Sequence, residues 1–175
     1  RVTGVQTCAL PISPAVDALR DRGPVTIAAE SPLSPDLDLL FARHVQAMHA
    51  DTPPESIHML PRGELASPSI TFLVMREAGE PVGMGALKRL SGSGGEIKSM
   101  HVLAERRGQG LSRLMLQALV AEARAGGLTR LSLETGAQDS FRAARALYAG
   151  AGFAECGPFE GYGADPNSVF MSRSL

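Results

Sequence analysis

The sequence lacks a long apolar run, an excess of basic residues and any cluster of cysteines or histidines. No stretch stays apolar for the length that a membrane-spanning helix needs. Lys and Arg number 17 against 18 Asp and Glu, so there is no cationic excess to favour nucleic acid or an anionic membrane surface. We therefore expect small molecules as ligands, with neither nucleic acid nor a membrane as a partner.

Cysteine is scarce. Cys8 and Cys156 are the only two, they form no C-x-x-C pair, and the histidines show no metal-ligand spacing. Neither a disulfide framework nor a zinc site is therefore expected, and the prediction is no metal. This cysteine usage suits a reducing compartment, so the expected location is cytoplasmic.

The N-terminal stretch RVTGVQTCALPIS has no initiator Met and resembles translated sequencing-adapter read-through. Its apolar part is short, is broken by Pro11 and follows no basic cluster, so a signal peptide is not predicted. We expect residues 1–13 to be a non-native extension. Residues 14–175 are long enough and, with the chain 44% hydrophobic, apolar enough to form a single domain with a full core.

Strands are expected where β-branched and apolar residues alternate with polar ones. These runs fall at residues 25–29, 70–76, 81–88, 96–102, 128–135, directly after 153, and 168–174. A short turn with Gly79 separates the second and third runs and predicts an antiparallel hairpin. A helix joins the run at 96–102 to that at 128–135, and such a crossover predicts a parallel pair.

Three apolar stripes at helical spacing predict helices, with Ser34 or Asp36 able to cap the first and Asp139 or Ser140 the third. The stripes are Leu37, Leu40, Phe41, Val45 and Met48; Leu111, Leu114, Met115, Ala118 and Leu119; and Phe141, Ala144, Leu147, Tyr148 and Ala151. His44 and His49 lie near the first stripe, and a lone helical histidine is usually a packed or solvated residue.

The turn before the second helix carries two arginines and two glycines, in the order Arg106-Arg107-Gly108-Gln109-Gly110-Leu111-Ser112. Glycines let a ligand approach the backbone, and the unpaired N–H groups of a helix start favour an anion. The pattern predicts a pyrophosphate cradle, with an ordinary helix start bearing exposed arginines as the alternative. A Walker A loop and a G-x-G-x-x-G dinucleotide fingerprint both fail to match.

This turn resembles the acyl-CoA-binding segment of the GNAT superfamily of acyl-CoA-dependent N-acyltransferases, Arg/Gln-x-x-Gly-x-Gly/Ala. Arg107, Gly110 and Ser112 occupy its positions, with Ser112 replacing the usual Gly or Ala. The run Leu-Tyr-x-x-x-Gly-Phe at 147–153 is a second resemblance. With PPESIH, GALK, GEIKSM, LETG and RALY, residues 25–175 resemble a subgroup of small bacterial GNAT acetyltransferases.

The resemblance implies an α/β (α+β) fold: a mixed, mostly antiparallel sheet of about seven strands, a splayed strand 4/strand 5 pair, and about four helices on both faces. It implies direct transfer of an acetyl group from acetyl-CoA to a primary amine in a ternary complex. The acceptor would be a small molecule, or the N-terminus or a lysine of a peptide. A non-catalytic acyl-CoA-binding or sensor module, and an acyltransferase with another acyl donor or a hydroxyl acceptor, remain alternatives. A homodimer is among the assemblies to test.

The resemblance also assigns roles to residues. Met100, His101 and Val102 would bind pantetheine through their backbone, and Arg107, Gly108, Gln109, Gly110, Leu111 and Ser112 would hold the pyrophosphate. Glu96 would be the general base and Tyr148 the general acid. Glu55, His58 and Glu134 are candidate substrate contacts.

Each of these roles has a structural alternative. Glu96 can instead pair with Lys98 as a structural or substrate-orienting carboxylate, and Tyr148 can be a core residue. Glu55 and His58 can belong to an ordered surface loop. Phe141 stands where the family often has an Asn that touches CoA, so that contact is expected to be lost or replaced.

Overall fold

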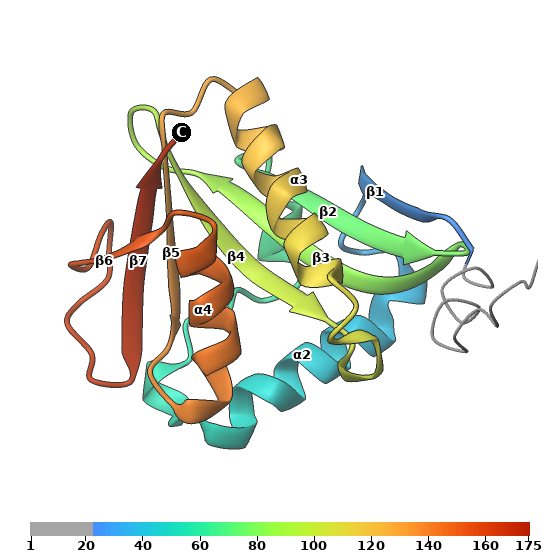
Figure 1. The fold of residues 1–175 in the computed structure, drawn as a ribbon, viewed down its shortest axis with the longest axis horizontal. Coiled ribbons are helices and arrows are strands. Elements are labelled where there is room, and N and C mark those ends of the chain that lie inside the picture. The colour runs from blue at the N-terminus through green and yellow to red at the C-terminus, as the bar shows by residue number, and fades with distance from the viewer. Residues whose placement is uncertain (1–22) are drawn as a thin grey trace, which may run out of the picture.

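The computed structural model describes residues 23–175, so the expectations for residues 1–13 and for Cys8 lie outside the described part. A seven-stranded sheet runs through this part in the order β1-β2-β3-β4-β5-β7-β6 (Figure 1). The strands are β1 Val25–Ala29, β2 Ile70–Glu77, β3 Glu80–Arg89, β4 Gly94–Val102, β5 Arg130–Gly136, β6 Ala154–Cys156 and β7 Ser168–Ser174. Only β4 and β5 pair in parallel, as their helical crossover predicts.

Three α-helices cover the sheet within residues 23–175, together with short 3-10 turns: α2 Asp38–Asp51, α3 Leu111–Ala125 and α4 Arg142–Gly150. Side chains of α3 and α4, including Met115, Leu119 and Tyr148, pack with Leu131 and Leu133 in the larger core cluster. A second cluster lies on the other face of the sheet. It packs α2 and the 3-10 turns at 35–37 and 64–66 against β2, β3 and the residue that follows β4. Its members are Leu37, Leu40, Leu65, Phe72, Val74, Met84, Ala86 and Leu103.

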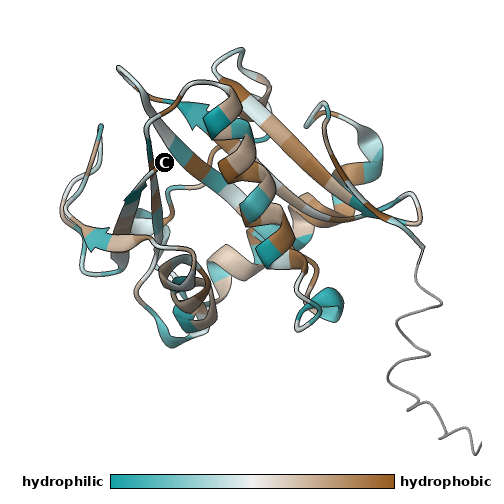
Figure 2. Ribbon diagram, turned by 45° about the horizontal axis from the view of Figure 1, so that its top comes forward, coloured by the Kyte–Doolittle hydropathy of each residue, from teal (hydrophilic) through white to brown (hydrophobic). Residues whose placement is uncertain are grey.

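The alternation along β2 explains the two layers, because Leu73 and Met75 belong to one cluster while Phe72 and Val74 belong to the other. Figure 2 shows the hydrophobic residues along the central strands, and hydrophilic residues alternating with them along the helices. Gly85 lets α3 approach closely, since a Cβ there would lie 2.9 Å from Leu119 Cδ1. The expected fold is confirmed.

The helices depart from the expected stripes and caps in detail. Val45 is 39% exposed and Leu114 is 43% exposed, while His44 takes a buried position on α2. The prediction of side-chain caps was wrong. Short 3-10 turns precede α2 and α4, and no side-chain cap hydrogen bond forms at either described start.

The parallel strands β4 and β5 are hydrogen-bonded over a short distance only. Their register runs from Gly94 opposite Arg130 to Ile97 opposite Leu133 and then stops, although β4 continues to Val102. The register between β3 and β4 then shifts: Ala86 pairs with Lys98 and Met84 with His101, so β4 has one extra residue there. This is a β-bulge, and Ser99 within it has a φ of 50°. The strands therefore open into a V above Ile97, as the splayed pair predicted.

Candidate active site

A groove of about 1430 Å³ of free space runs from the glycine turn to the opened edge of β4; we call it the turn groove. It is lined by eight of the nine residues predicted to bind CoA, namely Met100, His101, Val102, Arg107, Gly108, Gly110, Leu111 and Ser112. Gln109 lies in the same turn but does not line the groove. The structure thus places two separate sequence motifs along one wall.

The glycine turn takes a shape that other residues resist. Gly108 and Gly110 have φ of 74° and 80°, and Gly110 is the left-handed N-cap of α3. The N–H groups of Leu111 and Ser112 belong to the first helical turn, where no intrahelical acceptor exists. Arg106 pairs with the buried Glu77 at 3.1 Å. The helix start therefore offers the N–H groups of Leu111 and Ser112 to an anion, and Arg107 adds positive charge beside them.

Backbone polar groups of β4 above Ile97 complete the groove wall. Met100, His101 and Val102 follow the last β4–β5 pair, so the strand edge that faces β5 has no sheet partner there. Such an edge accepts an extended ligand as an added strand.

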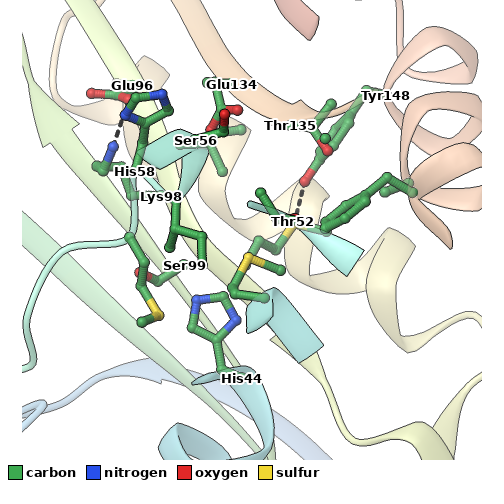
Figure 3. Close-up of a pocket in the computed structure, with 18 residues that line it drawn as sticks. His44, Thr52, Ser56, His58, Glu96, Lys98, Ser99, Glu134, Thr135 and Tyr148 are labelled. Carbon is green, nitrogen blue, oxygen red and sulfur yellow. Dashed lines mark hydrogen bonds and ion pairs between the residues drawn. The ribbon is translucent and has the colours of Figure 1, made fainter. Parts of the chain in front are cut away.

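A second cavity, which we call the splay pocket, lies where β4 and β5 separate (Figure 3). It has about 760 Å³ of free space, open to solvent. Its walls come from α2, β4, β5, α4 and the proline loop, defined as residues 52–59. Five residues, Met48, Met100, Phe141, Ala144 and Tyr148, line both the splay pocket and the turn groove. The two cavities therefore meet at Tyr148 and Met100.

Glu96 is buried at the splay pocket, with 2% of its surface exposed. Lys98 Nζ donates to Glu96 Oε1 at 2.9 Å and to the Tyr162 hydroxyl at 2.6 Å. The Tyr162 hydroxyl donates to the same Oε1 at 2.5 Å. Both bonds to the carboxylate use Oε1, which leaves Oε2 as the oxygen available to a ligand. Burial raises the pKa of Tyr162, and the Glu96 carboxylate raises it further, so the phenol remains a donor.

Glu134 on β5 is the second carboxylate of the splay pocket. The Ser168 hydroxyl donates to its Oε1 at 2.7 Å. Partial burial raises the pKa of Glu134, against the smaller lowering effects of Ser168, His58 and Lys98. Among the described residues, the hydrogen bond and the nearby positive charges thus do not fully offset the burial of the Glu134 carboxylate.

Two histidine rings lie where α2 crosses β4. The rings of His44 and His101 are 5.4 Å apart between centroids, and both residues are buried. Neither His44 Nδ1 nor His101 Nε2 has a hydrogen-bond partner in the described structure. Burial lowers the pKa of His44 to about 4, and burial together with His44 and Arg107 lowers that of His101 to about 4. Both rings are neutral at pH 7.

Tyr148 projects from α4 between the two cavities and is buried. Its hydroxyl approaches Met100 Sδ at 4.0 Å, and its ring contacts Phe153 edge to face. Burial, with a contribution from Glu134, raises the pKa of Tyr148 to about 12. The Tyr148 ring thus packs in the core, while its hydroxyl is a proton donor where the turn groove meets the splay pocket.

Of the three residues predicted to contact the substrate, two line the splay pocket and one does not. His58 lines the splay pocket and lies 3.8 Å from Asp165. Glu134 lines it as well, whereas Glu55 is exposed and is not part of the pocket wall. Phe141, expected to cost a CoA contact, lines both cavities instead.

Sequence reasoning missed Tyr162, which lies in the loop of residues 157–167, here called the aromatic loop. This loop crosses to the proline loop, because Asn167 Nδ2 donates to Ser56 Oγ at 3.1 Å and the Tyr162 ring meets the His58 ring edge-on. Tyr162 is 66 residues from Glu96, so no local pattern connects them. Only the presence of a lone tyrosine in a glycine-rich loop offered a hint.

The model of the acetyltransferase (GNAT) family matches residues 38–153. The uncharacterized N-acetyltransferase YsnE of Bacillus subtilis is 47% identical over 136 residues, which cover 78% of this chain and 90% of that protein. The IAA acetyltransferase of Azospirillum brasilense is 43% identical over 86% of this chain and 98% of that protein. A crystal structure assigned as an acyl-CoA N-acyltransferase of Klebsiella pneumoniae superposes with a TM-score of 0.69 at 32% identity, covering 86% and 97% of the two chains.

Within residues 23–175 no helix is both long and apolar enough to cross a bilayer. The same residues contain no group of three or more His, Cys, Asp or Glu arranged to hold a metal ion.

Proposed function

Because the chain belongs to the acetyltransferase (GNAT) family, we propose that it transfers an acetyl group from acetyl-CoA directly to a primary amine in a ternary complex. The observation that carries this proposal is the junction of the two cavities. Tyr148 and Met100 line both, so a donor in the turn groove and an acceptor in the splay pocket would meet beside them.

The turn groove would bind the donor. The backbone N–H groups from Gly108 to Ser112 and the Arg107 guanidinium would receive the pyrophosphate. The open edge of β4 at Met100 to Val102 would hold the pantetheine arm as an added strand. Backbone N–H groups there would also stabilise negative charge on the thioester oxygen.

Glu96 would take the proton of the acceptor amine. Lys98 and Tyr162 fix the carboxylate through Oε1, and Oε2 is then the oxygen that accepts the proton, directly or through a water. Once the amine is neutral, it attacks the thioester carbon, the new C–N bond forms and the C–S bond breaks. The nitrogen, which is cationic after the attack, then releases its second proton, and this proton restores the Tyr148 phenol after Tyr148 has protonated the sulfur. Lys98 and Tyr162 would act as positioning residues for this base.

Tyr148 would donate its proton to the departing sulfur. Its raised pKa keeps the phenol protonated at neutral pH, and its place at the junction brings it to the reacting end of the donor. The products are the N-acetyl amine and free CoA thiol.

Thiol release from acetyl-CoA in the presence of a panel of amines tests this function. We expect release that depends on the amine. IAA is tested beside the amines because one relative carries its name. Binding of CoA without release for any acceptor would favour the sensor module. Faster release from longer acyl-CoAs than from acetyl-CoA would instead indicate a different donor.

The base is tested by comparing Glu96→Gln/Lys98→Met with Lys98→Met. Changing either residue alone strands the buried charge of the other, which costs several kcal/mol, so Tm and CoA affinity are measured for each variant to separate loss of fold from loss of catalysis. We expect the double variant to be at least about a hundredfold slower than the Lys98→Met control. Equal rates in the two variants would remove Glu96 as the base.

A further inference from the structure

The charged groups of the splay pocket are unevenly balanced. Glu96 and Glu134 are its two carboxylates, and Lys98 is its only lysine or arginine among the described residues. Lys98 spends two of its three N–H donors on Glu96 and Tyr162. The cation therefore belongs to Glu96, and one negative charge remains.

That remaining charge sits on Glu134. Its recorded partner is the neutral hydroxyl of Ser168, which bonds Oε1 and leaves Oε2 for a ligand. His58 also lines the pocket, but its Nε2 lies 3.8 Å from Asp165 Oδ2. A partly buried carboxylate without its own cation is stabilised by a ligand that brings one.

The opposite wall supplies neutral hydrogen-bonding atoms. His44, Thr52 and Ser99 line the pocket, and each has a buried side-chain nitrogen or oxygen without a partner in the described structure. His44 is 5% exposed, and its ring carries no charge at pH 7. In the view of Figure 3 the two carboxylates lie at one end of the pocket and His44 at the other. Hydroxyls and a neutral imidazole can accept from an ammonium, which has donors only.

The reaction sharpens this requirement. The amine that attacks the thioester must be neutral, so a monoamine in its reactive form leaves Glu134 without a counter-charge. An acceptor with an acidic group would add a second uncompensated negative charge. Only an acceptor that keeps a positive charge while its reacting nitrogen is neutral balances the pocket.

We infer that the acceptor is a compact primary amine carrying a second cationic group, a short diamine being the simplest case, whose ammonium binds Glu134 while its other nitrogen is acetylated beside Glu96. This inference rests on the proposed function. The transfer yields the monoacetylated diamine and CoA thiol: the first proton of the reacting ammonium passes to Glu96, the Tyr148 proton passes to sulfur, and the second nitrogen proton restores the Tyr148 phenol.

Three acceptors of similar length separate the possibilities: putrescine, n-butylamine and γ-aminobutyrate. All offer a primary amine, and they differ only in whether the far end is cationic, apolar or anionic. We expect kcat/KM for putrescine to exceed both others by at least about tenfold, the scale of one charge-assisted hydrogen bond. Equal or better use of n-butylamine or γ-aminobutyrate overturns the inference while leaving acetyl transfer intact. No thiol release with any of the three, despite CoA binding, would instead count against the proposed function.

The variant Glu134→Gln tests the contact itself. The amide oxygen can still accept from Ser168, so the fold is expected to hold, while the charge is lost. We expect kcat/KM for putrescine to fall at least about tenfold and that for n-butylamine to change less than about threefold. Glu55→Gln is the matched control, because Glu55 is exposed and outside the pocket. An equal loss for both amines would show a structural role for Glu134 and overturn the assignment.

Discussion

Lys98 and Glu134 occupy the first positions beyond the last β4–β5 pair, Ile97 with Leu133, so two residues of opposite charge flank the point where the sheet opens. Below this level the two strands are joined by backbone hydrogen bonds, and above it the space between them belongs to ligands. The polar side chains nearest to the opening are therefore those with the greatest influence on what binds.

Reversing the charge at Arg107 should weaken CoA binding. Arg107→Glu replaces attraction by repulsion beside the expected pyrophosphate, and we predict a loss of at least about tenfold in affinity. Calorimetry with CoA measures it. Arg124→Glu, at the far end of α3, is the charge-matched control and should bind like the parent. Unchanged affinity of the Arg107 variant would mean that the turn does not hold the phosphates.

Removing the hydroxyl of Tyr148 should slow chemistry more than it weakens binding. Tyr148→Phe keeps the ring and its contact with Phe153, so packing survives. General acid catalysis is worth roughly a hundred- to ten-thousand-fold, and we predict a loss in that range. The measurement is single-turnover thiol release, because slow product release can hide the chemical step. A rate within about threefold of the parent would make Tyr148 a core residue only.

The buried histidines should make stability fall in mild acid. An unfolded histidine has a pKa of 6.5, while the pKa of folded His44 and of folded His101 is about 4. The stabilisation is present above pH 6.5 and is lost as the pH falls toward 4, because protons bind the unfolded chain first. From about pH 7.5 to about pH 5 each ring should cost roughly 2 kcal/mol.

Urea unfolding of His44→Leu at both pH values tests this. The variant should lose less stability on acidification than the parent does, by about the contribution of one ring. His49→Gln, an exposed position on the same helix, should follow the parent. The same loss in all three proteins would place the acid sensitivity elsewhere.

Two glycine substitutions should act in opposite directions. Gly85→Ala places a Cβ 2.9 Å from Leu119 Cδ1 and 3.4 Å from Met115, and such overpacking typically costs about 1–3 kcal/mol. Gly150→Ala, at the end of α4, meets nothing within 4 Å and should raise stability by up to about 1 kcal/mol. Thermal unfolding shows both as shifts of Tm. A Gly85 variant as stable as the parent would mean that α3 is not held against this glycine.

The strands were largely predictable from the sequence, because apolar and polar residues alternate along a strand that has one face buried, and this pattern is visible within a few residues. The expected closing strand at 168–174 matches β7, and the hairpin of β2 and β3 ends within one residue of expectation. The site was harder. Glu96, Tyr148 and the glycine turn lie within recognisable motifs, whereas the Tyr162 bond to Glu96 depends on a loop that folds back across the sheet.

Errors on the helices have a common physical cause. A stripe of apolar residues predicts a buried face, but Val45 is exposed and His44 takes the buried position, where its ring meets that of His101 on the same face of the sheet. Partners from distant segments decide which side of a helix is covered. The same holds for the proline loop, where Ser56 and His58 line the splay pocket while Glu55 is exposed.

The extra residue at Ser99 determines which face of the sheet each later side chain of β4 points to. Because three steps along β4 match two along β3, His101 lies on the side of His44, and Val102 packs with the opposite cluster. A chain shortened by one residue here would exchange these faces, placing a valine against α2 and an imidazole in the core beneath α3. Redesign of the acceptor pocket can therefore vary side chains on either side of the bulge, but the number of residues between Lys98 and His101 is fixed.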